Sequence, residues 1–283
     1  TAQIEVYNPN PIEYNIDYIQ LENNKTRTIS VDPTGTPGTN EFTAEIATTP
    51  PFNYHKHISF LLNYPHNSIE QTVSGAFGLI NINKVIQPSE HLGQSISNKI
   101  ENTLHKLKSF QTESGGFAYW PAKQNVNTWN TSYAGHFMLA AQSAGYQIDR
   151  NIFNKWVRYQ KTMTRKWVDN GPTSRYNQAY RLYTLALSDK TNNGAMNRLR
   201  NTENLKPEVT WRLAATYAIS GRINTAEKLI EELNVPKNTT KIPNTYSSDL
   251  REQAMILQTL SYLNRETEAI GLAPNREHGL YLH

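Results

Sequence analysis

The chain has 283 residues, of which 37% are hydrophobic and 18% charged, so it is long enough to bury the core of one large domain. Its net charge is +4, but the 28 Lys and Arg residues are spread along the chain with no run of five or more. This spread argues against nucleic-acid binding, which needs clustered basic side chains. The absence of cysteine excludes disulfides, thiolate nucleophiles and cysteine-ligated zinc.

The chain has no initiator methionine, no signal peptide and no apolar run of the roughly 20 residues that a membrane span requires. We therefore expect a piece of a longer protein, one that does not itself insert into a membrane.

The first fifty residues favour β-structure. Short segments rich in β-branched and aromatic residues are separated by turn formers; they are residues 4–8, 16–23, 27–31 and 41–47. Four short strands without a second layer are not stable alone. We therefore predict a small β region over residues 1–51 that packs against the following domain or against a part of the protein outside this sequence.

From Ser68 onward the apolar period changes from about two to about 3.6, which predicts helices. The predicted helices cover residues 68–85, 90–111, 129–144, 151–166, 174–188, 193–200, 207–220, 223–233 and 248–263. The chain is therefore predicted to be mainly α-helical.

The later helices repeat. Leu182, Leu213 and Ile256 are each followed 13 residues later by an alanine, across a short polar turn. This predicts successive antiparallel pairs of a longer and a shorter helix, which must stack to bury their faces. Such pairs form either an open superhelix or a closed α/α toroid. The uneven spacing, 31 and then 43 residues, favours the toroid.

The segment YPHNSIEQTVS, residues 64–74, places Ser68 and Gln71 three positions apart at the start of a predicted helix. Read from the residues alone, Ser68 caps the helix and Glu70 complements its dipole in the first turn. The Ser68 hydroxyl has no evident base in the neighbouring sequence that would activate it as a nucleophile.

This segment resembles the thioester segment of alpha-2-macroglobulin and complement-like proteins, approximately Tyr-Pro-Tyr-Gly-Cys-x-Glu-Gln-Thr-x-Ser. The matching positions are Tyr64, Pro65, Glu70, Gln71, Thr72 and Ser74. Asn67 and Ser68 replace the Gly-Cys pair. In that family the cysteine and the glutamine form an internal thioester that acylates a captured target. The resemblance therefore implies that Ser68 and Gln71 are degenerate thioester positions and that this chain does not trap targets covalently.

Two further stretches resemble the helical domain of bacterial members of that family. SGGFAYWP at 114–121, followed by residues 128–146, resembles a Gly-Gly-Phe turn, a Trp-Pro and a helix opening at Trp-x-Thr-x-Tyr. Residues 246–260 resemble its Tyr-x-Ser-x-x-Arg-x-x-Ala-x-x-Leu helix. The similarity runs from about residue 52 to residue 263.

The residues in these stretches also have a plain structural interpretation. Gly115 and Gly116 suit a tight turn. The neighbouring aromatics are predicted to pack in the core, with ligand stacking as the alternative; they are Phe117, Tyr119, Trp120 and Trp129.

Histidines do not indicate a catalytic or metal site. His136 lies among the apolar positions of its predicted helix, so we interpret it as a packing residue, and the base that assists acyl transfer in some thioester proteins is absent. His55 and His57 are two positions apart in a segment predicted to be extended, but no third metal ligand is evident. We predict neither a metal nor a cofactor.

Enzymes built on α/α toroids are a further alternative class. Cyclases of the squalene type need an Asp-rich motif that this chain lacks, and glycosidases need two carboxylates about 5 to 9.5 Å apart. The isolated aspartates lie near predicted helix ends, where capping explains them; they are Asp149, Asp169, Asp189 and Asp249. We therefore expect no catalytic activity.

The resemblance implies an α/α toroid over residues 52–283, truncated at its C-terminal end, with residues 1–51 forming the first part of a split CUB-like domain. It implies a structural and conformation-sensing domain of a bacterial macroglobulin that inhibits proteases non-covalently. The implied partners are proteases, through the full-length protein, and the other macroglobulin domains of the same chain. The implied location is the periplasm or the cell surface, with a lipoprotein tether as one form of attachment. The alternative function is a helical binding scaffold for a protein or envelope partner, without protease inhibition.

Overall fold

The computed structural model describes residues 17, 19, 25–33, 38, 40, 42, 44, 54–63, 67–233 and 248–272. Within these residues the chain is mainly α-helical and contains no β-strand, only two isolated β-bridges. Contacts between Cα atoms divide the chain into two units, Thr1–Phe52 and Asn53–His283. All of the described helices belong to the second unit.

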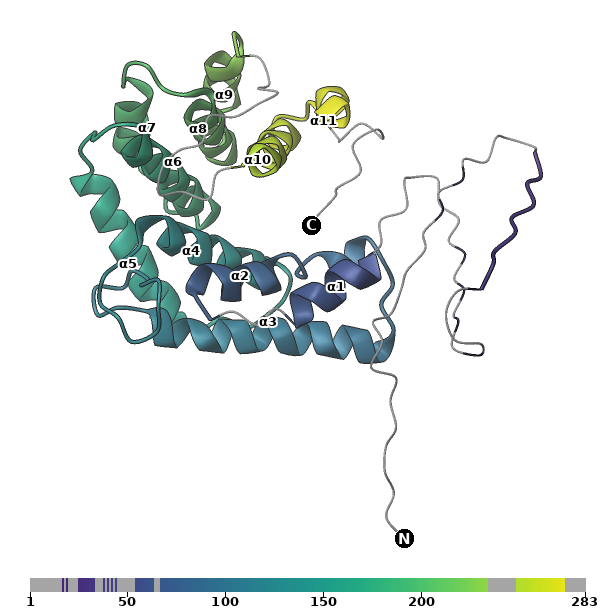
Figure 1. Cartoon of the computed structure of the whole chain (residues 1–283). Coiled ribbons are helices and arrows are strands. Elements are labelled where there is room, and N and C mark those ends of the chain that lie inside the picture. The colour runs from purple at the N-terminus through teal and green to yellow at the C-terminus, as the bar shows by residue number, and fades with distance from the viewer. Residues whose placement is uncertain are drawn as a thin grey trace. The chain divides into compact units, whose positions relative to one another are not determined.

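Figure 1 shows the helices in chain order. They are α1 (Tyr54–Leu62), α2 (Ile69–Phe77), the short 3₁₀ helix η1 (Ile82–Lys84), α3 (Glu90–Phe110), α4 (Thr128–Ser143), α5 (Arg150–Lys166), α6 (Pro172–Leu187), α7 (Asn193–Arg200), α8 (Pro207–Ile219), α9 (Ile223–Ile230), α10 (Asp249–Tyr262) and α11 (Glu266–Leu272).

The helices of this unit form two rows. In the inner row, α2, α4, α6, α8 and α10 each pack against the next. The outer row consists of the intervening helices α3, α5, α7, α9 and α11, each of which packs on the inner helices beside it. Figure 1 shows that the two rows follow the same curve. The inner helices α6 and α8 are buried along most of their length, which explains why their sequences are apolar on more than one face.

The predicted pairing of longer and shorter helices is confirmed. The pairs α6–α7, α8–α9 and α10–α11 have 16 and 8, 13 and 8, and 14 and 7 residues. Ala195 and Ala226, the repeated alanines of the first two short helices, are buried and let the helices of each pair approach closely.

One turn geometry ends all three longer helices of these pairs. The second residue after each helix has a positive φ: Asp189 at 55°, Gly221 at 75° and Asn264 at 56°. The following amide then donates to a carbonyl five residues back, as Lys190 N does to Leu185 O at 2.9 Å. This is the Schellman geometry, which satisfies the last carbonyls of a helix and reverses the chain. Gly145 repeats it after α4, with φ of 95° and the Tyr146 amide donating to Ala141 O.

Three sequence predictions need correction. The helix predicted over 68–85 is interrupted, because α2 ends at Phe77 and the chain continues through Gly78 into the separate η1. Residues 25–33, which include the strand predicted at 27–31, have no regular structure, and Ile29 and Val31 are about half exposed, at 51% and 52%, with no partner strand among the described residues. The segment around His55 and His57 is helical, in α1, and not extended.

The other predicted strands, at 4–8, 16–23 and 41–47, lie almost entirely outside the described residues, as do Tyr64 and Pro65 of the thioester-like segment. The remaining predicted helices agree with α3 to α10 within a few residues at each end. Helix α1 was not predicted, and α11 was predicted only through its repeat.

Candidate functional site

The start of α2 is held by a capping box. Ser68 is the N-cap residue, in extended conformation at φ −70° and ψ 158°. Its Oγ accepts a hydrogen bond from the Gln71 amide at 3.3 Å, and Gln71 Oε1 accepts from the Ser68 amide at 3.4 Å. These bonds satisfy two amides that the helix itself leaves without partners. The capping interpretation of Ser68 is confirmed.

The same two side chains also touch directly. The Ser68 hydroxyl donates to Gln71 Oε1 at 2.9 Å, and Ser68 is completely buried. The turn is fixed from outside by the Ile69 amide, which donates to Tyr119 O at 3.1 Å, and by Lys106 Nζ, which donates to Asn67 Oδ1 at 2.9 Å. A serine oxygen therefore lies beside a carboxamide, and within the described residues no basic group hydrogen-bonds that oxygen.

The next turn of α2 connects this segment to α4. Ser74 Oγ donates to Glu70 Oε1 at 3.3 Å and lies 3.0 Å from the Tyr133 hydroxyl. Burial raises the pKa of the Tyr133 phenol, so it remains a neutral hydrogen-bonding group. Thr72 Oγ1 is buried without a hydrogen bond.

Tyr133 in turn connects α4 to α10. Its ring lies 4.7 Å from the Trp129 ring, and the Arg251 guanidinium lies 4.6 Å from the Trp129 ring centre and 5.5 Å from that of Tyr133. Cation–π contacts of this kind favour a fixed arrangement of arginine and aromatic rings. The three stretches that carry the family resemblance, far apart in sequence, thus meet at Ser74, Tyr133, Trp129 and Arg251.

The Gly-Gly-Phe turn has the predicted role. Gly115 has φ of +95°, and a Cβ there would overlap the Lys155 carbonyl of α5; a Cβ on Gly116 would lie 2.6 Å from Val126 Cγ1. Phe117 is buried, and its amide donates to Thr131 Oγ1 at 2.9 Å.

The core prediction is confirmed for Phe117 and Trp129, Tyr119 is only partly buried, and the prediction is wrong for Trp120. Trp120 is 50% exposed, with only an edge contact to Tyr119 at 5.2 Å. It lies where the chain leaves the core and reverses at Ala122, which has φ of 58°.

His136 is a packing residue, as interpreted from the sequence. Its Nδ1 lies 3.2 Å from the Tyr180 hydroxyl, and its ring meets Phe77 and Tyr183 edge-on at 4.9 and 5.3 Å. Desolvation, with a smaller contribution from the charge of Arg212, lowers the pKa of His136 to about 3, so the imidazole is neutral at pH 7.

Sequence reasoning missed a group of buried charges on the inner row. The Arg212 guanidinium of α8 lies 4.9 and 4.8 Å from the ring centres of Tyr180 and Tyr183. Glu252 of α10 is fully buried and accepts a short hydrogen bond from the Tyr176 hydroxyl. Burial raises the pKa of the Glu252 carboxyl, and the charge of Arg212 opposes that shift. The sequence does carry a signal for these buried charges. Glu208 and Arg212 lie four residues apart in a helix that is otherwise largely apolar.

The Glu252 and Glu208 carboxylates do not make a catalytic pair. Both residues are buried, at 0% and 2% exposed, so a substrate has no route to them in this structure. Their neighbours are aromatic side chains and Arg212, which is an arrangement that fixes inner helices against one another.

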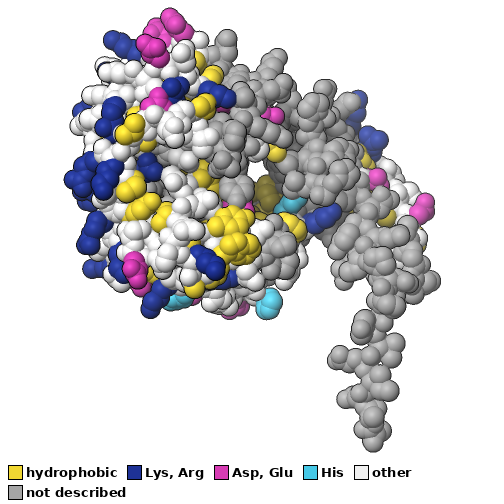
Figure 2. All heavy atoms as spheres, turned by 60° about the vertical axis from the view of Figure 1, so that its left-hand side comes forward, with side chains coloured by type: hydrophobic (Ala, Val, Ile, Leu, Met, Phe, Trp, Pro, Cys, Tyr) yellow, Lys and Arg dark blue, Asp and Glu magenta, His cyan; other side chains and the backbone are white. Residues whose placement is uncertain are grey.

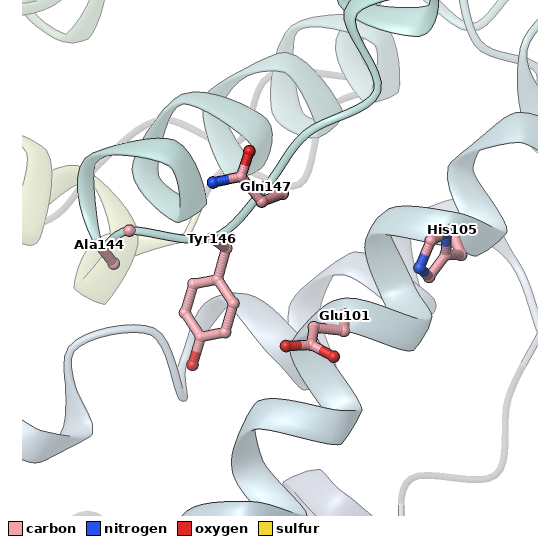
Figure 3. Close-up of a pocket in the computed structure, with 6 residues that line it drawn as sticks. Glu101, His105, Ala144, Tyr146 and Gln147 are labelled. Carbon is pink, nitrogen blue, oxygen red and sulfur yellow. The ribbon is translucent and has the colours of Figure 1, made fainter.

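A surface hollow of about 480 Å³ lies elsewhere, between α3 and the turn after α4. Figure 3 shows the Tyr146 ring extending from that turn beside Glu101 of α3, whereas the Gln147 carboxamide points away from Glu101 and from His105, one helical turn further along α3. The hollow has no buried polar group that would orient a ligand. Among the described residues no three His, Cys, Asp or Glu side chains could hold a metal ion, and positions 55 and 57 do not face each other on a helix.

Helices paired into inner and outer rows, with the three motif segments joined across α2, α4 and α10, define a helical domain. No family model matches the chain. Alpha-2-macroglobulin of Escherichia coli K12 is 26% identical over 228 residues, which cover 75% of this chain but only 14% of that protein.

Solved structures agree in fold. The native E. coli alpha-2-macroglobulin spanning domain MG7 to the C-terminus aligns with a TM-score of 0.66 at 22% identity, over 79% of this chain and 38% of that one. The trypsin-activated E. coli protein aligns with a TM-score of 0.60 at 20% identity, over 76% of this chain and 16% of that one. The chain is a distant homologue of bacterial alpha-2-macroglobulins, and its helical unit has their fold. No described helix has the length and apolarity to cross a bilayer.

Proposed function

We propose that this chain is the thioester-type α/α toroid of a bacterial macroglobulin that has lost its thioester and acts on proteases without a covalent bond. The homology, the two rows of paired helices and the meeting of the three motif segments support this assignment. The sequence covers a small part of its relatives, so the protease-trapping activity belongs to the full-length protein.

The contact between Ser68 and Gln71 carries the proposal. A thioester in this family joins the side chains at these two positions, and here the Ser68 Oγ lies 2.9 Å from Gln71 Oε1. The geometry for condensation is retained, but the oxygen is a neutral hydroxyl already committed to hydrogen bonds with Gln71 and with its amide. Without a base to remove its proton, the hydroxyl does not attack the carboxamide.

The remaining role is conformational. The E. coli relative is described in a trypsin-activated form as well as a native one, and the same helical fold aligns with both. We propose that the domain is carried as a rigid body when a protease cleaves the parent protein and helps to cage that protease. We place the parent in the periplasm or at the cell surface, where such proteases are met.

Amine incorporation tests the loss of the thioester. The chain is incubated with a fluorescent primary amine and then analysed by intact mass and by peptide mapping across Ser68 and Gln71. We expect no labelling and a mass equal to that of the unmodified chain. Labelling at Gln71, or a mass lower by one ammonia, contradicts the proposal. The variant Ser68→Cys with Asn67→Gly, which restores the family's residue pair, is the positive control.

The alternative function is a binding scaffold without protease inhibition. Protease cleavage of the full-length protein distinguishes it from the caging role. If cleavage by a protease produces neither compaction nor retention of the protease, the caging role is wrong and the scaffold role is favoured.

A further inference from the structure

The outer helix α5 presents an exposed basic face that the linear sequence does not reveal. Six of its 17 residues are Lys or Arg and none is acidic; the basic residues are Arg150, Lys155, Arg158, Lys161, Arg165 and Lys166. All six are exposed. They occupy about 160° of the helix circumference, counted at about 100° per residue.

The opposite side of α5 explains this separation. Ile152, Trp156, Gln160 and Thr164 follow one another at four-residue spacing and are buried. Trp156 donates its indole N–H to Thr131 O at 2.8 Å, which fixes the rotation of α5 against α4. Because the rotation is fixed, the basic side chains remain on the solvent side. In Figure 2, which turns the left-hand side of Figure 1 forward, Lys and Arg side chains are numerous and acidic ones few on the left part of the face.

Neighbouring charges do not neutralise this face. Asp149, at the start of α5, accepts from the Asn151 and Ile152 amides as the N-cap, and Asp169, after its end, forms an ion pair with Arg175 at 2.8 Å. Among the described residues no basic side chain of α5 takes part in an ion pair. Helix α7 extends the face, because Arg198 is exposed and bonds the Thr164 carbonyl at 2.9 Å.

We propose that the basic face of α5 and Arg198 binds the surface of a bilayer containing anionic phospholipid. The proposal does not depend on the loss of the thioester. Clusters of four to eight Lys and Arg on a helix suit such surfaces, since each adds attraction to the negative headgroups without insertion. The face lies on the solvent side of one outer helix. Its exposed residues are Lys, Arg and Asn, with no exposed aromatic side chain to stack on a base, which favours a lipid surface over single-stranded nucleic acid. Val168, the second residue after α5, is 77% exposed and adds an apolar contact.

Vesicle co-sedimentation tests this binding. The chain is mixed with vesicles of phosphatidylcholine alone or with about one third phosphatidylglycerol, at low and at high salt, since surface electrostatics weaken within a Debye length. We expect binding only to the anionic vesicles, and its loss at high salt.

Two triple variants of equal charge locate the site. Lys155→Gln, Arg158→Gln and Lys161→Gln together should weaken binding about a hundredfold, whereas Lys84→Gln in η1, Arg222→Gln before α9 and Lys228→Gln in α9, all exposed, should together weaken it much less. Circular dichroism verifies that both variants are folded. The proposal is overturned if the chain ignores anionic vesicles, if both triples weaken binding equally, or if single-stranded DNA of matched charge binds the α5 face more tightly than the vesicles.

Discussion

At the scale of single residues, the most informative position is Ser68. A capping serine is common at the start of any helix, but here the cap is completely buried and its hydroxyl is directed at the carboxamide of Gln71. The residue that we propose to prevent covalent chemistry is thus also the N-cap of α2. The contribution of Ser68 to the free energy of unfolding can be measured separately from its reactivity.

Ser68→Ala should lower the free energy of unfolding by about 1 kcal/mol, because the Gln71 amide loses its acceptor and the Gln71 carboxamide keeps only the Ser68 backbone amide as a donor. Urea denaturation measures this. Ser95→Ala, where the exposed hydroxyl bonds only the His91 carbonyl within α3, should change stability by less than about 0.5 kcal/mol. Equal effects of the two substitutions would show that the capping box is not formed.

His136 gives a pH dependence with a definite sign. Its pKa in the folded chain is lowered to about 3, whereas the unfolded chain titrates near 6.5, so below pH 6.5 the unfolded state binds a proton that the folded state does not. Stability is therefore lost as the pH falls, by up to about 2 kcal/mol between pH 6.5 and 5. Burial raises the pKa of Glu252, which acts in the opposite direction, since stability from that group is lost as the pH rises through its folded-state pKa.

The contribution of His136 is isolated by comparing urea midpoints of the chain and of His136→Gln from pH 7 to pH 5. The variant should be less sensitive to pH over that interval. If the urea midpoints of the chain and of His136→Gln fell equally between pH 7 and pH 5, His136 would take up a proton in the folded state as well.

At the scale of elements, α4 packs tightly on α5 at a glycine. Gly135 lies directly against the Trp156 indole, and a Cβ there would overlap the ring. Gly135→Ala should therefore destabilise the chain by about 2 kcal/mol or more through overpacking, despite the better helix propensity of alanine. In contrast, Gly194→Ala in α7 meets only Asn192 Oδ1 at 3.6 Å and should be neutral or slightly stabilising. Thermal unfolding of both variants tests the packing, and a stable Gly135→Ala would contradict it.

The joining of α4 and α10 is tested by a double-mutant cycle. Arg251→Met and Trp129→Leu each remove the cation–π contact seen at 4.6 Å. If the contact couples the two helices, the double variant should lose less than the sum of the single losses, by about 0.5 to 2 kcal/mol. Additive losses would show that the two motif segments lie together without stabilising each other.

At the scale of the whole molecule, much of the helical unit could be predicted from sequence because its signals are local. Helices α3 to α10 have regular apolar spacing and end in capping or turn residues, and the repeated alanines marked the pairs. The separation of α2 from η1 could not be predicted, since Gly78 continues in helical conformation while the chain around it turns.

Features that depend on three dimensions were missed. The buried Arg212 and Glu252 come from helices far apart in sequence, and the basic face of α5 is invisible to a search for consecutive charges because its members are spaced around one side of a helix. The motif segments were identified by resemblance, but their meeting at Tyr133 follows only from the packing of α2, α4 and α10.

The most direct test of the central claim is the state of a protease bound to the full-length parent. After cleavage by trypsin, the mixture is resolved by native electrophoresis and, in parallel, after denaturation. The non-covalent mechanism predicts that trypsin remains with the parent in the native gel and is released completely by denaturation. A denaturation-resistant adduct between trypsin and a peptide containing Gln71 would contradict it.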